Sequence, residues 1–234
     1  MRYLVSVLVL LLVAGCAFAD DIVTMPTANQ LKGGEVDVAA YYIGVENAAG
    51  APPGAPEFVQ YQTLYVGLTD WLEVDAHRAM VDGDETSTVL VATLKLLSET
   101  PTLPDVVVGC RNIGGTPTTK NPLVREKSKD QSYFLSMAKT FFVNPAAPGP
   151  PLFRVHLSVG TPDWTLFNDR RHDGVFGGLQ LLLQPDLGLV TLHDGEDVIT
   201  GVTWMPKNSG LTLKAGSYGP HWWAGLAFRK ALNF

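Results

Sequence analysis

The chain has 234 residues, of which 46% are hydrophobic and 17% charged, and its formal net charge is −6 at pH 7. This acidic balance, with no dense cluster of lysine and arginine apart from residues 125–129, excludes nucleic acid from the expected partners. Beyond the first residues, no apolar run reaches the roughly 18 residues that a membrane-spanning helix needs. The apolar residues are therefore expected in short strands.

The first nineteen residues (1–19) are predicted to be a cleaved export signal. A positive start, an apolar run over residues 3–13 and a small-x-small site at residues 17–19 are typical of such signals. A second cut is open before Cys16, where the sequence resembles the lipobox of bacterial lipoproteins and the cysteine would carry lipid. We expect the ordinary cut. In either case Cys110 is the only other cysteine, so no intrachain disulfide is expected.

Residues 20–33 are predicted to be an irregular lead-in, and an alternation of apolar and polar residues begins at Glu35. Long polar or proline-rich stretches at residues 44–57, 114–130 and 161–173 are predicted to be loops. Between and beside these loops the period of two predicts strands at 35–43, 58–68, 71–80, 86–98, 105–113, 131–142 and 152–160.

The last sixty residues contain a hairpin repeat. Gly178, Gly201 and Gly225 begin similar segments about 23 to 24 residues apart, a spacing that suits two strands of about ten residues and two tight turns. The repeat adds about five strands, which brings the total to about twelve, an even number. We therefore predict an all-β fold, an antiparallel up-and-down transmembrane β-barrel over residues 34–234.

The connections and the aromatic residues agree with this fold. The three long loops all fall at one end of the predicted meander, whereas the connections at the other end are short turns or compact proline-rich links. Trp71, Trp204 and the pair Trp222-Trp223 lie near strand ends, where interfacial aromatic girdles are expected.

Charged side chains alternate with the apolar ones along the strands and are expected to line the lumen. They would pair across a narrow bore, and if water fills the bore they would set its ion selectivity. The less favoured interpretation is metal binding or acid/base chemistry. Its candidates are Glu73, Asp75 and His77, joined by Glu35 and Asp37 on a neighbouring strand. The predicted lining residues are Glu35, Asp37, Glu73, Asp75, His77, Lys95, Arg111, Arg154, Lys214 and Arg229.

The end of the chain resembles the C-terminal signal of outer-membrane barrels. Phe228, Leu232 and Phe234 share one face of an alternating last strand. In barrels with this signal the assembly machinery recognises the last strand. The resemblance therefore implies the barrel-assembly machinery and outer-membrane lipid as partners.

Several short motifs resemble those of the YjbH-type outer-membrane barrel proteins, which are associated with exopolysaccharide export. They are Met-Pro-Thr-Ala at residues 25–28, the stretches 66–74 and 108–115, and Phe-Gly-Gly-Leu at 176–179 leading to 193–197. Those proteins are usually much longer, so only a barrel portion can be shared. The resemblance implies bacterial outer-membrane placement and polysaccharide as one cargo, and it carries no catalytic residue.

An enzymatic alternative comes from His156, Ser158 and Asn168, which resemble the His-x-Ser and later Asn of outer-membrane phospholipase A, a twelve-stranded calcium-dependent barrel. A histidine that takes the serine proton and an asparagine that orients the histidine form a triad. However, His156 and Ser158 share the predicted inward face of Arg154, whereas a lipase must present its nucleophile to the bilayer.

We therefore expect a non-enzymatic role without a metal or cofactor. The barrel would be a narrow passive channel for small solutes, or a structural or export-associated barrel related to polysaccharide. A soluble or lipid-anchored β-protein that binds an apolar ligand is a further alternative, and it requires apolar residues to face inward.

Overall fold

A computed structural model describes residues 25–44, 58–81, 85–114, 116–117, 131–142, 152–162 and 171–232. The predicted export signal at residues 1–19, Cys16, Asn168 and Phe234 lie outside the described residues. Within the described ranges, no helix has the length and apolar character needed to cross a membrane. The strands are β1 (Glu35–Gly44), β2 (Phe58–Thr69), β3 (Leu72–Val81), β4 (Glu85–Leu97), β5 (Asp105–Arg111), β6 (Thr116–Pro117), β7 (Ser132–Phe142), β8 (Leu152–Gly160), β9 (Gly174–Gln184), β10 (Leu187–His193), β11 (Val198–Trp204), β12 (Leu211–Tyr218) and β13 (His221–Ala231).

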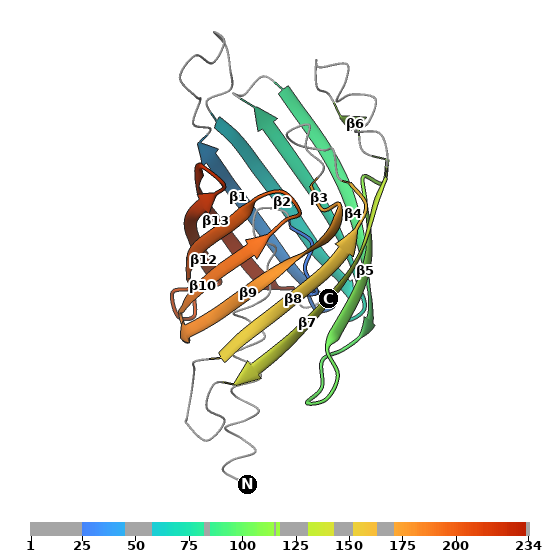
Figure 1. The fold of residues 1–234 in the computed structure, drawn as a ribbon, viewed down its shortest axis with the longest axis vertical. Helices are drawn as coiled ribbons and strands as arrows, with labels where there is room; N and C mark the ends of the chain where they lie inside the picture. Colours follow the sequence, from blue (N-terminus) through green and yellow to red (C-terminus); the bar gives the residue numbers. More distant parts are fainter. Residues whose placement is uncertain are drawn as a thin grey trace.

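Twelve of the strands form a closed antiparallel barrel (Figure 1). Each long strand pairs with the next along the chain, and β1 pairs with β13 to close the ring. The two-residue β6 pairs with β4 and stands outside this ring order. The predicted up-and-down barrel of about twelve strands is therefore confirmed, and β6 lies within a segment that the sequence predicts to be a loop.

The two faces of the barrel wall differ in polarity, because successive side chains of a strand point to opposite sides. In β8 the burial pattern alternates strictly: Arg154, His156 and Ser158 are buried inside, whereas Val155 and Leu157 are exposed outside. The outer face carries many large exposed apolar residues, among them Val38, Leu64, Leu68, Leu90, Val159, Val175, Leu189, Val202, Leu213, Leu226 and Phe228.

The two ends of the barrel differ in the connections they carry. The termini end holds the start of β1, the end of β13 and the connections 70–71, 98–104, 143–151, 185–186 and 205–210. The loop end holds the three long connections 45–57, 112–131 and 161–173, together with three short ones. The predicted placement of the long connections at one end follows from the observed strand order.

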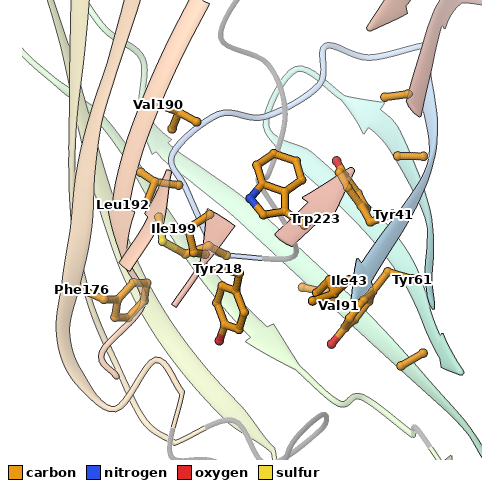
Figure 2. Close-up of a cluster of buried hydrophobic side chains, with 14 of the residues drawn as sticks. Tyr41, Ile43, Tyr61, Val91, Phe176, Val190, Leu192, Ile199, Tyr218 and Trp223 are labelled. Atoms are coloured by element: carbon orange, nitrogen blue, oxygen red, sulfur yellow. The ribbon is translucent and has the colours of Figure 1, made fainter. Parts of the chain in front are cut away.

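The interior also contains an apolar cluster, shown in Figure 2 with Tyr41, Tyr61 and Trp223 among its members. Trp223 is 1% exposed, whereas its neighbour Trp222 is 49% exposed on the outside. The sequence prediction that both belong to an interfacial girdle is wrong for Trp223. Two consecutive residues of a strand cannot share a face, so only Trp222 reaches the outer surface.

Inward-facing glycines make room for these large side chains. A Cβ atom on Gly201 would lie 2.6 Å from the Trp223 ring, and one on Gly225 would lie 2.3 Å from the Tyr41 ring. Two of the glycines that begin the sequence repeat are therefore needed where the barrel wall meets an inner aromatic side chain.

Candidate functional site: the barrel lumen

The structure places the ten predicted lining residues on the inward side of the strands. Seven of them are buried, and the other three are partly exposed near the termini end: Glu35, Lys95 and Arg229. The seven are Asp37, Glu73, Asp75, His77, Arg111, Arg154 and Lys214. Whether they line a water-filled path stays a prediction.

Asp37 and Arg229 connect the first and last strands. They are direct partners in the register between β1 and β13. Arg229 donates from Nε and Nη2 to Asp37 Oδ2 at 3.1 and 2.8 Å. The pair is an ion pair between partly and fully buried groups, and it lies at the seam that closes the barrel.

Arg154 is the centre of a larger network at the termini end. Its two terminal nitrogens donate to Glu99 Oε2 at 2.5 Å and to Asp105 Oδ2 at 2.6 Å. Nη1 also donates to Thr140 Oγ1 at 2.8 Å, and Nε donates to Asn29 Oδ1 at 2.9 Å. Every nitrogen of the guanidinium therefore has an acceptor, as a buried arginine requires.

Two lysines complete the network. Lys95 lies 4.0 Å from Asp105 and Lys139 lies 3.6 Å from Glu99. Glu99 is in the connection between β4 and β5, outside any strand pattern. Sequence analysis missed it because its partner Arg154 is 55 residues away, and only the register of the closed sheet brings the two together.

Glu73 receives the segment that precedes β1. The backbone N–H of Leu31 donates to Glu73 Oε2 at 2.6 Å, and the Thr93 hydroxyl donates to Oε1 at 3.4 Å. The Gln30 amide donates to the Thr93 carbonyl at 3.0 Å and to its hydroxyl at 3.1 Å. Residues 25–31 of the predicted lead-in are not in a strand, and they lie inside the barrel.

The Glu73, Asp75 and His77 side chains lie along the inner face of β3. The His77 ring packs edge-on against Tyr65 with centroids 5.3 Å apart. Among the described residues, no group of three or more histidine, cysteine, aspartate or glutamate side chains is arranged to hold a metal ion.

The two described residues of the phospholipase-like alternative are not joined to each other by a hydrogen bond. His156 Nε2 bonds to Gln180 Oε1 at 3.0 Å, whereas the Ser158 hydroxyl donates to Ser136 at 2.8 Å. Both side chains are buried on the inward face. The geometry therefore places the serine away from the outer surface, where bilayer lipid would meet the protein.

A buried cluster at the loop end was not predicted from the sequence. Asp194 Oδ2 accepts from Arg171 Nε at 2.9 Å and from the Tyr218 hydroxyl at 2.7 Å. Its Oδ1 accepts from the backbone N–H groups of Glu196 and Asp197 at 3.0 and 2.8 Å. The carboxylate therefore shapes the connection between β10 and β11 and joins it to β12.

The environment of Asp194 favours its ionised form. Burial alone would raise the pKa, but the Arg171 guanidinium and the donated hydrogen bonds outweigh burial and lower the pKa from 3.8 to about 2.

Nearer the middle of the barrel, Lys214 Nζ donates to the Tyr41 hydroxyl at 3.2 Å and lies 5.6 Å from the centre of the Tyr41 ring. The lumen thus holds paired charges and aromatic rings together.

Comparison with known proteins gives limited similarity. No protein-family model and no curated protein matches the sequence. Among solved structures, the KdgM porin has a TM-score of 0.49 and 8% identity over 85% of this chain and 99% of that chain. The COG4313 outer membrane channel of Pseudomonas putida F1 has a TM-score of 0.43 and 14% identity over 90% and 98%. The N-terminal β-barrel domain of Pseudomonas aeruginosa OprF has a TM-score of 0.28 and 11% identity over 86% and 100%.

Proposed function

We propose that the chain is an integral β-barrel of a bacterial outer membrane with a non-enzymatic role, acting as a narrow passive channel for small polar solutes. The observation that carries this proposal is the inversion of polarity across the barrel wall. Large apolar side chains face outward all around the ring, and ionised side chains such as Asp37 and Arg154 face inward. A soluble barrel that binds an apolar ligand requires the reverse arrangement.

Aromatic residues at both ends of the barrel support a membrane span between them. At the loop end, Tyr42 stacks on Phe58 at 5.1 Å and on Trp222 at 5.3 Å, counted between ring centroids. At the termini end, Trp71 and Trp204 are exposed beside their turns. Tryptophan and tyrosine favour the two membrane–water interfaces, so the strands between these belts are expected to lie in hydrocarbon.

Outer-membrane barrels have short turns at the periplasmic side and longer loops outside. The termini end would therefore face the periplasm. The export signal at residues 1–19 would deliver the chain there, and the barrel-assembly machinery would recognise the last strand. Phe228 in that strand and Leu232, which directly follows it, are both exposed. Their exposure supports the proposed assembly signal, which Phe234 would complete.

A structural or export-associated barrel is the second candidate, and it includes the YjbH-like role in polysaccharide export. The filled interior favours it, because Trp223, Tyr61 and Phe176 are fully buried within the ring. Such side chains leave less space for solute than an interior of small residues. Flux of small solutes distinguishes the two candidates.

The test reconstitutes the refolded chain, beginning at Asp20, into liposomes and planar bilayers. Because residues 25–31 lie inside the barrel, a variant without residues 25–32 is measured beside the full chain. We expect uptake of small sugars and ions above that of protein-free vesicles. Absence of uptake in both forms favours the structural role, and phospholipid hydrolysis that Ser158→Ala abolishes would contradict a non-enzymatic barrel.

A further inference from the structure

The segment before β1 crosses the whole lumen at the termini end. Asn29 accepts a hydrogen bond from Arg154 of β8, only five residues before Gly34, which adjoins β1. In the ring order, β8 lies six strands from β1 in either direction, so the two strands face each other across the barrel. Five extended residues span at most about 17 Å, and the long Arg154 side chain reaches toward them.

This segment, residues 25–34, is hereafter the luminal strap. It touches the wall at two further strands on its way: the hydrogen bonds of Leu31 to Glu73 and of Gln30 to Thr93 join it to β3 and β4. Met25 and Ala28 have no exposed surface and belong to the inner apolar cluster. In Figure 1 the blue coil before β1 runs within the ring of strands, and in Figure 2 the pale blue coil crosses the interior beside the cluster.

The base of the strap is built as a sharp turn from the lumen into the wall. Gly34 has φ of 81°, a conformation that residues with a side chain rarely adopt. Its N–H donates to the Gly67 carbonyl at 2.8 Å, and the Gly33 N–H donates to Asp70 Oδ1 at 3.0 Å. A Cβ atom on Gly67 would lie 2.1 Å from the Lys32 carbonyl oxygen, so the wall at Gly67 leaves room for the strap.

Beyond its base, the strap has no part in the ladder of the sheet. Residues 25–32 are not in a strand, and residues 29–31 are held across the lumen by hydrogen bonds to side chains or to one carbonyl. Water can replace hydrogen bonds of this kind at small net cost, whereas it cannot replace a strand of the closed sheet without opening the barrel. Displacement of the strap would therefore leave the wall intact.

We propose that the luminal strap is a gate: it closes the periplasmic end of the lumen, and passage of solute requires its displacement about the Gly33-Gly34 turn. This regulation rests on the proposed channel function. The strap is held by the polar side chains of Glu73, Thr93 and Arg154. These side chains then influence the passage of solute indirectly, because their hold on the strap sets how often the gate opens.

The test records ion current through single barrels in planar bilayers, with Cys110→Ala in every variant to leave no other thiol in the mature chain. The pair Q30C/T93C joins the strap to β4 through a disulfide or a short reducible thiol crosslinker, because the Gln30 amide already contacts Thr93. We expect the joined form to lose its openings and reductant to restore them to the level of Q30C alone.

Two variants test whether removal or displacement of the strap raises the current. Deletion of residues 25–32 removes the strap, and Gly67→Ala pushes on it from the wall without changing its sequence. Both should raise the mean current several-fold over the full chain. Gly188→Ala is the matched control, because a Cβ atom there would lie 3.6 Å from its nearest neighbour, an ordinary contact, and it should leave the current unchanged.

The outcomes separate the gate from the channel. Equal currents in the joined, reduced and shortened barrels would overturn the gate and leave the channel function standing. No current in any form, with folding verified by the shifted migration of unheated barrels in gel electrophoresis, would contradict the channel itself and the gate with it. If the shortened chain fails to fold, the joined and reduced forms of the full chain decide.

Discussion

The Trp223 indole lies against Gly201 on the inner wall, at the place where a side chain on that glycine would stand. The indole Nε1 donates to the carbonyls of Thr200 and Ser217 at 3.2 and 3.1 Å, which anchors the ring across β11 and β12. A large aromatic side chain can lie flat on the wall of a narrow barrel only where the wall residue beneath it has no side chain. The glycine repeat of the sequence supplies such places.

Gly201→Ala should therefore destabilise the barrel. The new Cβ atom would lie 2.6 Å from the indole and 2.9 Å from the Ala215 carbonyl oxygen, so the ring must shift and lose a hydrogen bond. We expect a loss of about 1 to 3 kcal/mol in the free energy of unfolding, measured by urea titration in detergent with tryptophan fluorescence. Gly188→Ala, with room for its methyl group, is the control. Equal stability of the two variants would show that the glycine is not needed for the ring.

The Asp37–Arg229 pair should stabilise the seam of the barrel. Asp37→Asn removes the carboxylate to which Arg229 donates two hydrogen bonds in a partly buried site, and breaking such a pair costs up to about 3 to 5 kcal/mol. The double variant D37N/R229Q should be less destabilised than the sum of the two single variants, as urea titration would measure. Additive effects would mean that the ion pair does not couple β1 to β13.

An arginine introduced on the outer face should destabilise the barrel more when its position lies deeper in the membrane. Leu226 lies in the middle of β13 and is exposed, so Leu226→Arg is expected to cost about 2 to 4 kcal/mol in a bilayer. Leu68, beside the turn between β2 and β3, is the depth control, and Leu68→Arg should cost about 0 to 1 kcal/mol. Refolding yield and urea titration in vesicles measure both. Equal costs at the two positions would contradict the proposed orientation of the barrel in the membrane.

Acid should weaken the connection between β10 and β11. The folded pKa of Asp194, about 2, is below its ordinary value of 3.8, so its contribution is present above the ordinary value and is lost as pH falls through about 2. Asp194→Asn should cost about 2 kcal/mol at pH 7, and the difference from the natural chain should shrink between pH 4 and about pH 2. Urea titrations at both pH values test this. Asp186→Asn, in the turn between β9 and β10, is the control and should follow the natural chain.

Much of the barrel could be predicted because alternation along a strand is a local property. Strand β8 matches its predicted bounds, 152–160, and the inward side of Asp37, Glu73 and Arg154 follows from the parity of their neighbours. The number of strands follows from the turns and the repeat. These features need no knowledge of which strand lies beside which.

The missed features depend on contacts between distant segments. The partners of Arg154 come from residues 29, 99, 105 and 140, and only the closed ring brings them together. The luminal strap has no periodic pattern, so nothing local indicates that it lies inside the lumen. The sequence did contain the signal that Trp223 faces inward, because it directly follows the outward Trp222.

The most direct test of the membrane-spanning barrel uses these two adjacent tryptophans. Two variants retain Trp222 alone or Trp223 alone, with phenylalanine at the other tryptophan positions, and each is refolded into vesicles that contain nitroxide-labelled lipid. We predict strong quenching of Trp222 fluorescence, because this side chain faces outward, and weak quenching of Trp223 fluorescence, because this side chain faces the lumen. Strong quenching of Trp223 with weak quenching of Trp222, or no quenching of either, would contradict the membrane-spanning barrel.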